Sequence, residues 1–131
     1  MTALHTLQRE EYGPVGVDET IIASLYDRAQ MIMSVFVDDG VATMELTQRI
    51  FREAQAEDGI SEGSVYTLLA HTVQSLGLKR EFLGGLNCDD MLCWLMKETS
   101  QMRYADISDA TGLKKSQVAS SIAEVRNRLL S

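Results

Sequence analysis

The sequence is poor in proline, cysteine and histidine, and each shortage excludes a kind of structure. Pro14 is the single proline in 131 residues, so no later residue lacks the backbone N–H that a helix needs. Cys88 and Cys93 lie five residues apart and far from both histidines, which is not the spacing of zinc or redox sites. We therefore expect no metal, no cofactor, and a structural or incidental role for the two thiols.

Long apolar runs and a signal peptide are also missing. No apolar stretch reaches the ~20 residues that a membrane span requires. The opening MTALHTLQREEYG has no basic segment followed by an apolar one. The sequence therefore predicts a cytoplasmic protein without a membrane contact. Because we find no nucleophile paired with a base and no glycine-rich phosphate loop, we also expect no enzymatic activity.

The chain does contain many apolar residues, 45% of the total, and a net charge of -7 that is unevenly placed. Residues 1–59 carry four arginines against eleven acids, whereas residues 60–131 carry eight basic and eight acidic residues. Residues 114–131 have four basic residues and one acid. Because nucleic acids are polyanions, any DNA contact should involve this C-terminal end.

Apolar residues recur at helical spacing along the chain, and strand-like alternation is absent. The pattern predicts an all-α protein of about six helices. We expect a loose lead-in at 1–17, an acidic helical domain at 18–78, a short linker at 79–86 and a helix-turn-helix domain at 87–131. The second helix should begin near Ala42. The expected N-caps are Asp18, Ser64, Asn87 and Ser116.

The C-terminal segment RYADISDATGLKKSQVASSIAEVRNRLL has the pattern of a helix-turn-helix unit. Gly112 suits the left-handed backbone of the turn. Ser108 and Thr111 depart from the pattern, because they stand where an alanine and an aliphatic residue are usual. A plain helical hairpin is the alternative. The expected helix contacts are Ile107, Leu113, Val118 and Ile122, and the last helix should bury the stripe Val118, Ile122, Val125 and Leu129.

The opposite side of the last helix carries small polar residues and Glu124. Serine and asparagine can bond to bases or phosphates, but this side lacks an arginine or lysine that would read guanine. Lys114 and Lys115 stand where phosphate contacts are expected, although they can equally be a solvated pair. The candidate DNA-binding residues are Lys114, Lys115, Ser116, Gln117, Ser120, Arg126 and Arg128.

The segment LNCDDMLCWLMKETSQMRYADISDATGLKKSQVASSIAEVRNRL resembles the fourth region of sigma-70-type RNA polymerase initiation factors, especially the small extracytoplasmic-function group. Residues 24–54, SLYDRAQMIMSVFVDDGVATMELTQRIFREA, resemble the second region of the same family. In that family, the helix that corresponds to MELTQRIFREA binds the clamp of RNA polymerase. The resemblance implies that RNA polymerase is bound through Leu46, Gln48, Arg49 and Arg52.

The chain departs from the family in two respects. The segment VYTLLAHTVQSLGLKR corresponds to the promoter-melting part of the family. It is poor in the aromatic and basic residues that bind single-stranded DNA. A linker of about ten residues reaches ~35 Å at most, whereas the two promoter elements lie on the order of 50 Å apart. We therefore expect the two halves to pack compactly rather than to straddle a promoter.

Two hypotheses follow from the sequence. The first is a sigma-like transcription regulator that binds DNA through its C-terminal helix-turn-helix, weakly when alone, and/or RNA polymerase through its acidic N-terminal helices. The second is a protein-interaction module, a sigma mimic or antagonist, that has lost DNA binding. Its partner would be core polymerase or a sigma or anti-sigma factor. The sequence leaves the oligomeric state open.

Overall fold

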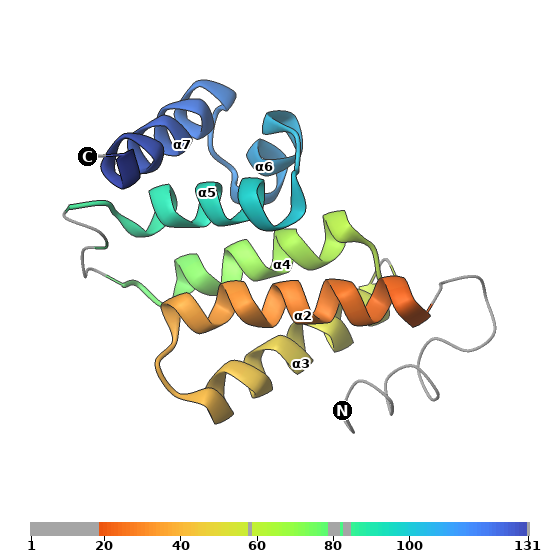
Figure 1. Ribbon diagram of the computed structural model, residues 1–131. Helices are drawn as coiled ribbons and strands as arrows, with labels where there is room; N and C mark the ends of the chain where they lie inside the picture. The colour runs from red at the N-terminus through yellow and green to blue at the C-terminus, as the bar shows by residue number, and fades with distance from the viewer. Residues whose placement is uncertain (1–18, 58, 79–81, 83–84, 131) are drawn as a thin grey trace. The chain divides into compact units, whose positions relative to one another are not determined.

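The computed structural model describes residues 19–57, 59–78, 82 and 85–130. Over these residues the protein is all-α, with six helices and no strand, which confirms the predicted fold class (Figure 1). The expected lead-in at 1–17 and the Asp18 cap lie outside the described residues. The helices are α2 (Glu19–Phe36), α3 (Gly40–Glu57), α4 (Glu62–Ser75), α5 (Cys88–Ser100), α6 (Tyr104–Thr111) and α7 (Lys115–Leu130).

The chain divides into two compact units, residues 1–69 (unit 1) and 70–131 (unit 2), and the division falls within α4. From the sequence we placed the linker at 79–86, and that boundary stays a prediction. Within that stretch, Phe82 and Leu86 exchange two backbone hydrogen bonds of 2.8 Å each. Leu86 is completely buried.

Unit 1 is organised around the packing of α2 against α3. The rings of Tyr26 and Phe51 meet with their centroids 5.2 Å apart, and both residues are fully buried. Tyr26 is buried although the helical pattern of apolar residues does not include it. That pattern predicts one buried stripe on α2, and all of its members are buried except Ile21, which is 60% exposed: Ile21, Ile22, Leu25, Ala29, Ile32, Met33 and Phe36. The buried residues of α2 are Ile22, Leu25, Tyr26, Ala29, Ile32, Met33 and Phe36.

Helix α3 begins at Gly40, two residues earlier than predicted, because Asp39 caps it. The Asp39 carboxylate accepts a hydrogen bond from the Val41 N–H at 3.0 Å, and its carbonyl accepts the first helical bond from Thr43 at 2.9 Å. Helical spacing predicts that Met44 shares the inner side of α3 with Phe51 and Ala54, which are buried, yet Met44 is 40% exposed. Thr43 is buried instead, and its hydroxyl donates to the Asp39 carbonyl at 3.0 Å.

The N-cap of α4 was assigned to the wrong serine. Ser61 precedes the helix, and its hydroxyl accepts from the Ser64 N–H at 3.0 Å. Ser64 returns the bond, because its own hydroxyl accepts from the Ser61 N–H at 3.0 Å. The two serines form a reciprocal capping arrangement in which Ser64 is the third helical residue rather than the cap.

Unit 2 contains α5, α6 and α7, each of which packs against the other two. The predicted cap of α5 is confirmed: the Asn87 side chain accepts from the Asp90 N–H at 2.8 Å, and the Asp90 carboxylate accepts from the Asn87 N–H at 3.2 Å. The core of the three helices includes Leu92, Leu95, Met96, Ile107, Val118, Ile122 and Val125, all buried.

Helix α7 departs from its prediction at both ends. It begins at Lys115, so Ser116 lies inside the helix and is not its cap. The side-chain oxygen of Gln117 forms a capping hydrogen bond instead, because it accepts from the Lys114 N–H at 2.9 Å. Leu129, expected to complete the buried stripe, is 51% exposed.

Candidate functional site

The connection between α6 and α7 is a three-residue turn, 112–114, that begins with a glycine. Gly112 adopts the predicted left-handed conformation, with φ 77°, and its N–H donates to the Ser108 carbonyl at 2.9 Å. This backbone geometry strongly disfavours any residue with a Cβ. A short turn opened by such a residue sets the direction in which α7 leaves α6.

The two departures from the helix-turn-helix pattern are both explained by this turn. The Ser108 hydroxyl donates to the Leu113 carbonyl. The Thr111 hydroxyl donates to the Ile107 carbonyl at 2.7 Å and accepts from the Leu113 N–H at 3.2 Å. The two hydroxyls therefore bond the carbonyl and the N–H of Leu113 in the turn, while the bond to Ile107 runs back along α6. Thr111 is buried and Leu113 is half-buried.

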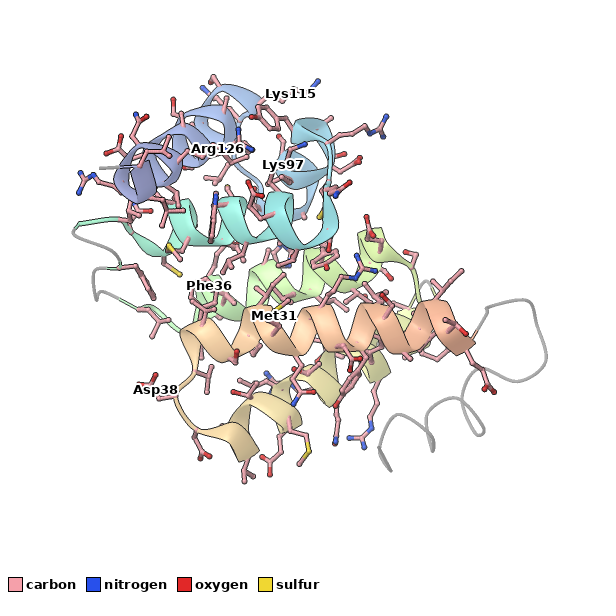
Figure 2. All side chains as sticks on the ribbon, viewed as in Figure 1. Met31, Phe36, Asp38, Lys97, Lys115 and Arg126 are labelled. Carbon is pink, nitrogen blue, oxygen red and sulfur yellow. The ribbon has the colours of Figure 1, made fainter. Side chains whose placement is uncertain are left out.

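The predicted DNA-binding residues share the surface of α7 and the turn before it. Lys114, Lys115, Ser116, Gln117 and Ser120 are all exposed. Figure 2 shows Lys115 at the start of α7 and Arg126 further along the same helix. The structure thus brings these side chains to one helix, with the lysines at its N-terminal end.

The arginines of α7 are already engaged by carboxylates. Arg126 forms an ion pair with Glu98 of α5, with 3.2 Å between Nη2 and Oε1. Arg128 pairs with Glu124, one turn earlier on α7, at 3.1 Å. No carboxylate among the described residues forms an ion pair with Lys114 or Lys115.

A hollow of about 440 Å³ lies beside the polar face of α7. Its charged side chains are all acidic, and two of them come from the first turn of α5. These carboxylates were not recognised as neighbours of the candidate interface, because the sequence places them about thirty residues before it. The lining residues are Asn87, Asp89, Asp90, Leu113, Ser116, Gln117, Ser120, Ser121 and Glu124.

The residues expected to contact polymerase lie on α3 in unit 1. Arg49 and Arg52 are exposed, while Leu46 and Gln48 are half-buried. Arg49 pairs with Glu53 at 3.8 Å. The four therefore do not form a uniformly exposed surface, and the two arginines are its accessible part.

The hydroxyl of Tyr26 is buried beside α3 without a hydrogen-bond partner among the described residues. Burial raises the pKa of Tyr26, and the nearby Gln48 side chain offsets part of that rise although it lies outside hydrogen-bond geometry. Gln48 is half-buried, which reduces what it alone can offer to a partner.

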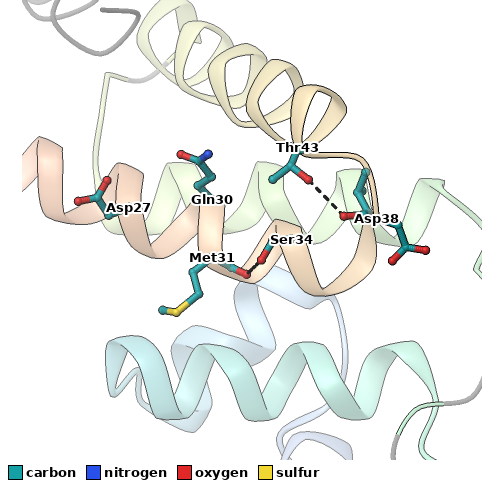
Figure 3. A pocket seen from close by; sticks show the side chains of 8 residues that line it. Asp27, Gln30, Met31, Ser34, Asp38 and Thr43 are labelled. Atoms are coloured by element: carbon teal, nitrogen blue, oxygen red, sulfur yellow. Dashed lines mark hydrogen bonds between the residues drawn. The ribbon is translucent and has the colours of Figure 1, made fainter. Parts of the chain in front are cut away.

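A second hollow, of about 400 Å³, lies at the corner between α2 and α3. Figure 3 shows two of its polar groups: the Ser34 hydroxyl donates to the Met31 carbonyl at 2.6 Å, and the Thr43 hydroxyl donates to the Val37 carbonyl at 3.2 Å. Asp27, Gln30 and Asp38 also line this hollow. No sequence motif indicated it.

The cysteines are free thiols, and Cys93 is fully buried. Burial raises the pKa of Cys93 to about 12, and the nearby carboxylates of Asp89 and Asp90 add to the rise. A thiol with so high a pKa is a poor nucleophile and a poor metal ligand at neutral pH. No cluster of potential metal ligands is present among the described residues.

Comparison with known proteins identified no relative: no family model, no curated protein and no solved structure matches the chain. Within the ranges that the structure describes, no helix combines the length and the apolar character that crossing a membrane requires. Function must therefore be argued from the residues themselves.

Proposed function

We propose that this protein is a cytoplasmic transcription regulator of sigma-like organisation, which contacts DNA through α6 and α7 and RNA polymerase through α3. One observation carries the proposal: Lys114 and Lys115 lie exposed, without a carboxylate partner among the described residues, where α7 begins after its short turn. Helix-turn-helix proteins use this region of the second helix at the DNA.

The position of the two lysines is unfavourable for the helix itself. The N-terminal end of a helix carries a partial positive charge, and a cation there destabilises the helix by roughly 0.3–1 kcal/mol. The first turn of α7 has no acidic residue to offset it. The two lysines and the N-terminal end of α7 together create a positive potential that attracts a phosphate.

DNA binding by the isolated protein should be weak and nearly independent of sequence. The outward face of α7 offers Ser116, Ser120 and Asn127, with Glu124 close by, but no free arginine fork for guanine. Few phosphates are neutralised, so the log–log salt slope should be about -2 to -3. A partner that holds the unit on DNA would make weak contacts sufficient.

A salt titration of the pure protein on random and promoter-bearing duplexes tests the DNA contact. Replacing Lys114 and Lys115 by glutamate should abolish binding to both duplexes alike. The matched control is Arg49→Glu with Arg52→Glu, which makes the same charge change on α3 of unit 1. Nanomolar, sequence-selective binding at physiological salt would contradict the proposal, as would binding that survives the lysine substitutions.

The polymerase contact rests on the resemblance of MELTQRIFREA to the clamp-binding helix and on the exposure of Arg49 and Arg52. Arg52→Ala with Gln48→Ala should weaken co-purification with core polymerase from native cytoplasm while helicity stays unchanged. Met44→Ala, at a partly exposed position on the same helix, is the control. A wild-type protein that retains no polymerase would refute this part.

The second candidate function is a protein-interaction module without DNA binding, and the acidic hollow beside α7 favours it. Asp89, Asp90 and Glu124 repel a phosphate backbone that approaches from that side. If the protein fails to bind DNA even at low salt while its helices stay folded, this candidate replaces the first. A sigma or anti-sigma factor recovered in the pull-down would then support it.

A further inference from the structure

The hydroxyl of Tyr26 is a buried donor that the packing of unit 1 does not use. Tyr26 is fully buried with its ring against Phe51, and no described residue accepts a hydrogen bond from its O–H. The large majority of buried polar groups in folded proteins have a partner, so this exception requires an explanation. The ring alone would supply the packing, and a role for the hydroxyl must therefore be sought in the polar side chains beside it.

Two polar side chains of α3, Gln48 and Arg52, act on this hydroxyl. Gln48 lies beside it but outside hydrogen-bond geometry, and the positive charge of Arg52 also reaches it. The two residues are four apart, which places them one turn from each other on the same face of α3. Gln48 is half-buried and Arg52 is exposed. The hydroxyl, the amide and the guanidinium therefore form a series that runs from the core of unit 1 to its surface.

Arg52 differs from the other arginines that the structure describes. Each of the others forms an ion pair with a carboxylate, whereas Arg52 forms none with any described residue. This is unexpected in a chain with 19 acidic and 12 basic residues. Asp27 of α2 is close enough for its charge to act on the Tyr26 hydroxyl, yet it does not pair with Arg52. The guanidinium of Arg52 can therefore donate to an acceptor from outside the chain.

We propose that Arg52 and Gln48 form a binding site for a carboxylate, an aspartate or glutamate side chain of the partner protein, and that Tyr26 positions Gln48 within it. The inference rests on the proposed partner contact of α3. A glutamine amide can accept and donate at the same time. Its oxygen accepts from the Tyr26 hydroxyl, its N–H donates to the carboxylate, and the guanidinium of Arg52 donates to the other carboxylate oxygen. The buried hydroxyl is then satisfied in the complex, which favours binding.

Acetate is the simplest probe of this site, because it carries the carboxylate alone. NMR follows the side-chain N–H signals of Gln48 and Arg52 in the labelled full chain, with sodium chloride at the same ionic strength as the reference. Acetate should shift both signals saturably, and more than the signal of Arg49 on the same helix. Arg52→Gln should abolish the shift of Gln48. Shifts at Gln48 and Arg52 that are no larger than the shift at Arg49 would refute the site.

Tyr26→Phe tests the positioning role, because it removes the hydroxyl and keeps the ring against Phe51. At subsaturating acetate, the shift of the Gln48 amide should fall by about half or more. The melting temperature should stay the same or rise, because the variant loses a buried hydroxyl that has no partner in the free chain. An unchanged Gln48 shift would overturn the positioning role, whatever the change in stability.

Purified core RNA polymerase serves as the protein probe. Arg52→Gln should weaken its affinity about tenfold, and Arg52→Glu should weaken it further, because a glutamate also repels a carboxylate. Asp27→Asn should strengthen binding, since it removes a negative charge beside the site. Arg49→Gln makes the same charge change on the same helix and should cost less than Arg52→Gln. If Arg52→Glu binds as well as Arg52→Gln, the partner's group is not a carboxylate and the inference fails.

The two probes separate this inference from the function on which it rests. If acetate binds at Gln48 and Arg52 but the wild type retains no polymerase, the carboxylate site stands and the proposed polymerase contact fails. If polymerase binds the wild type but acetate does not select Gln48 and Arg52, the polymerase contact stands and the carboxylate site is refuted.

Discussion

Helices α3 and α7 both present a polar face to solvent, yet they begin with opposite charges. α3 is preceded by Asp39, whose carboxylate caps the helix and complements its positive end. α7 is preceded by Lys114 and begins with Lys115, which oppose that end. Local charge thus stabilises the start of α3 and destabilises the start of α7. This contrast supports the proposed contact between the start of α7 and a phosphate.

The i,i+4 ion pairs on the two helices also differ, both in the order of their charges and in their length. On α3 the cation precedes the anion, Arg49 before Glu53, whereas on α7 Glu124 precedes Arg128. The second order is the more favourable one in a helix. The Glu124–Arg128 pair is also shorter, 3.1 Å against 3.8 Å. Arg128 is therefore held more firmly than Arg49.

The largest effect is expected at the buried face of α3. Phe51 is fully buried against Tyr26. Phe51→Ala should therefore lower the free energy of unfolding by about 3–5 kcal/mol in urea melts, the usual range for losing a core aromatic. Met44→Ala on the same helix removes a side chain that is 40% exposed and serves as the control. Equal losses in the two variants would show that α3 has no distinct buried face.

The cap of α3 should contribute less. Asp39→Ala removes the acceptor of the Val41 N–H. It should lower the free energy of unfolding by about 1 kcal/mol, as other N-cap truncations do. Asp39→Asn keeps an acceptor in place and should restore most of the loss, which separates the hydrogen bond from the charge. If Asp39→Asn is as unstable as Asp39→Ala, the charge rather than the cap stabilises the helix.

The start of α7 should respond in the opposite direction. Lys115→Glu replaces an unfavourable charge by a favourable one and should raise the free energy of unfolding by roughly 0.3–1 kcal/mol at low salt, an increase that salt screens. The same substitution should weaken DNA binding. A variant that gains stability and loses binding would link the two properties at one residue. A loss of stability instead would contradict the assigned position of Lys115.

Most of the helices could be predicted because apolar side chains recur at the helical period wherever a face is buried. Periodicity reports a direction around the helix, but not whether a neighbour is present there, and so Met44 and Leu129 were wrongly placed inside. The caps of α4 and α7 were misassigned for a different reason. Ser64 and Ser116 have favourable hydroxyls, but the serine at Ser61 and the amide of Gln117 form the actual cap bonds.

The candidate site was only partly predictable. The lysines and serines of α7 are local to one helix, so their common surface follows from spacing alone. The Arg126–Glu98 pair joins residues that lie 28 positions apart. The acidic hollow likewise combines the first turn of α5 with the middle of α7. Such contacts depend on how the helices pack, and no local pattern in one sequence encodes them. Ser108 and Thr111 were recognised as departures, but their bonds to the turn required the structure.

The smallest effect is expected where the apolar stripe of α7 ends. Leu129 is 51% exposed, whereas Ile122, two turns earlier, is fully buried. Leu129→Ala should therefore change the free energy of unfolding by less than about 0.5 kcal/mol, the usual limit for surface substitutions. Ile122→Ala should lower it by about 2–5 kcal/mol. Urea melts of both variants compare similar truncations on one helix. A loss above about 1 kcal/mol at Leu129 would show that the end of α7 is covered, in solution, by apolar surface such as a second copy of the chain.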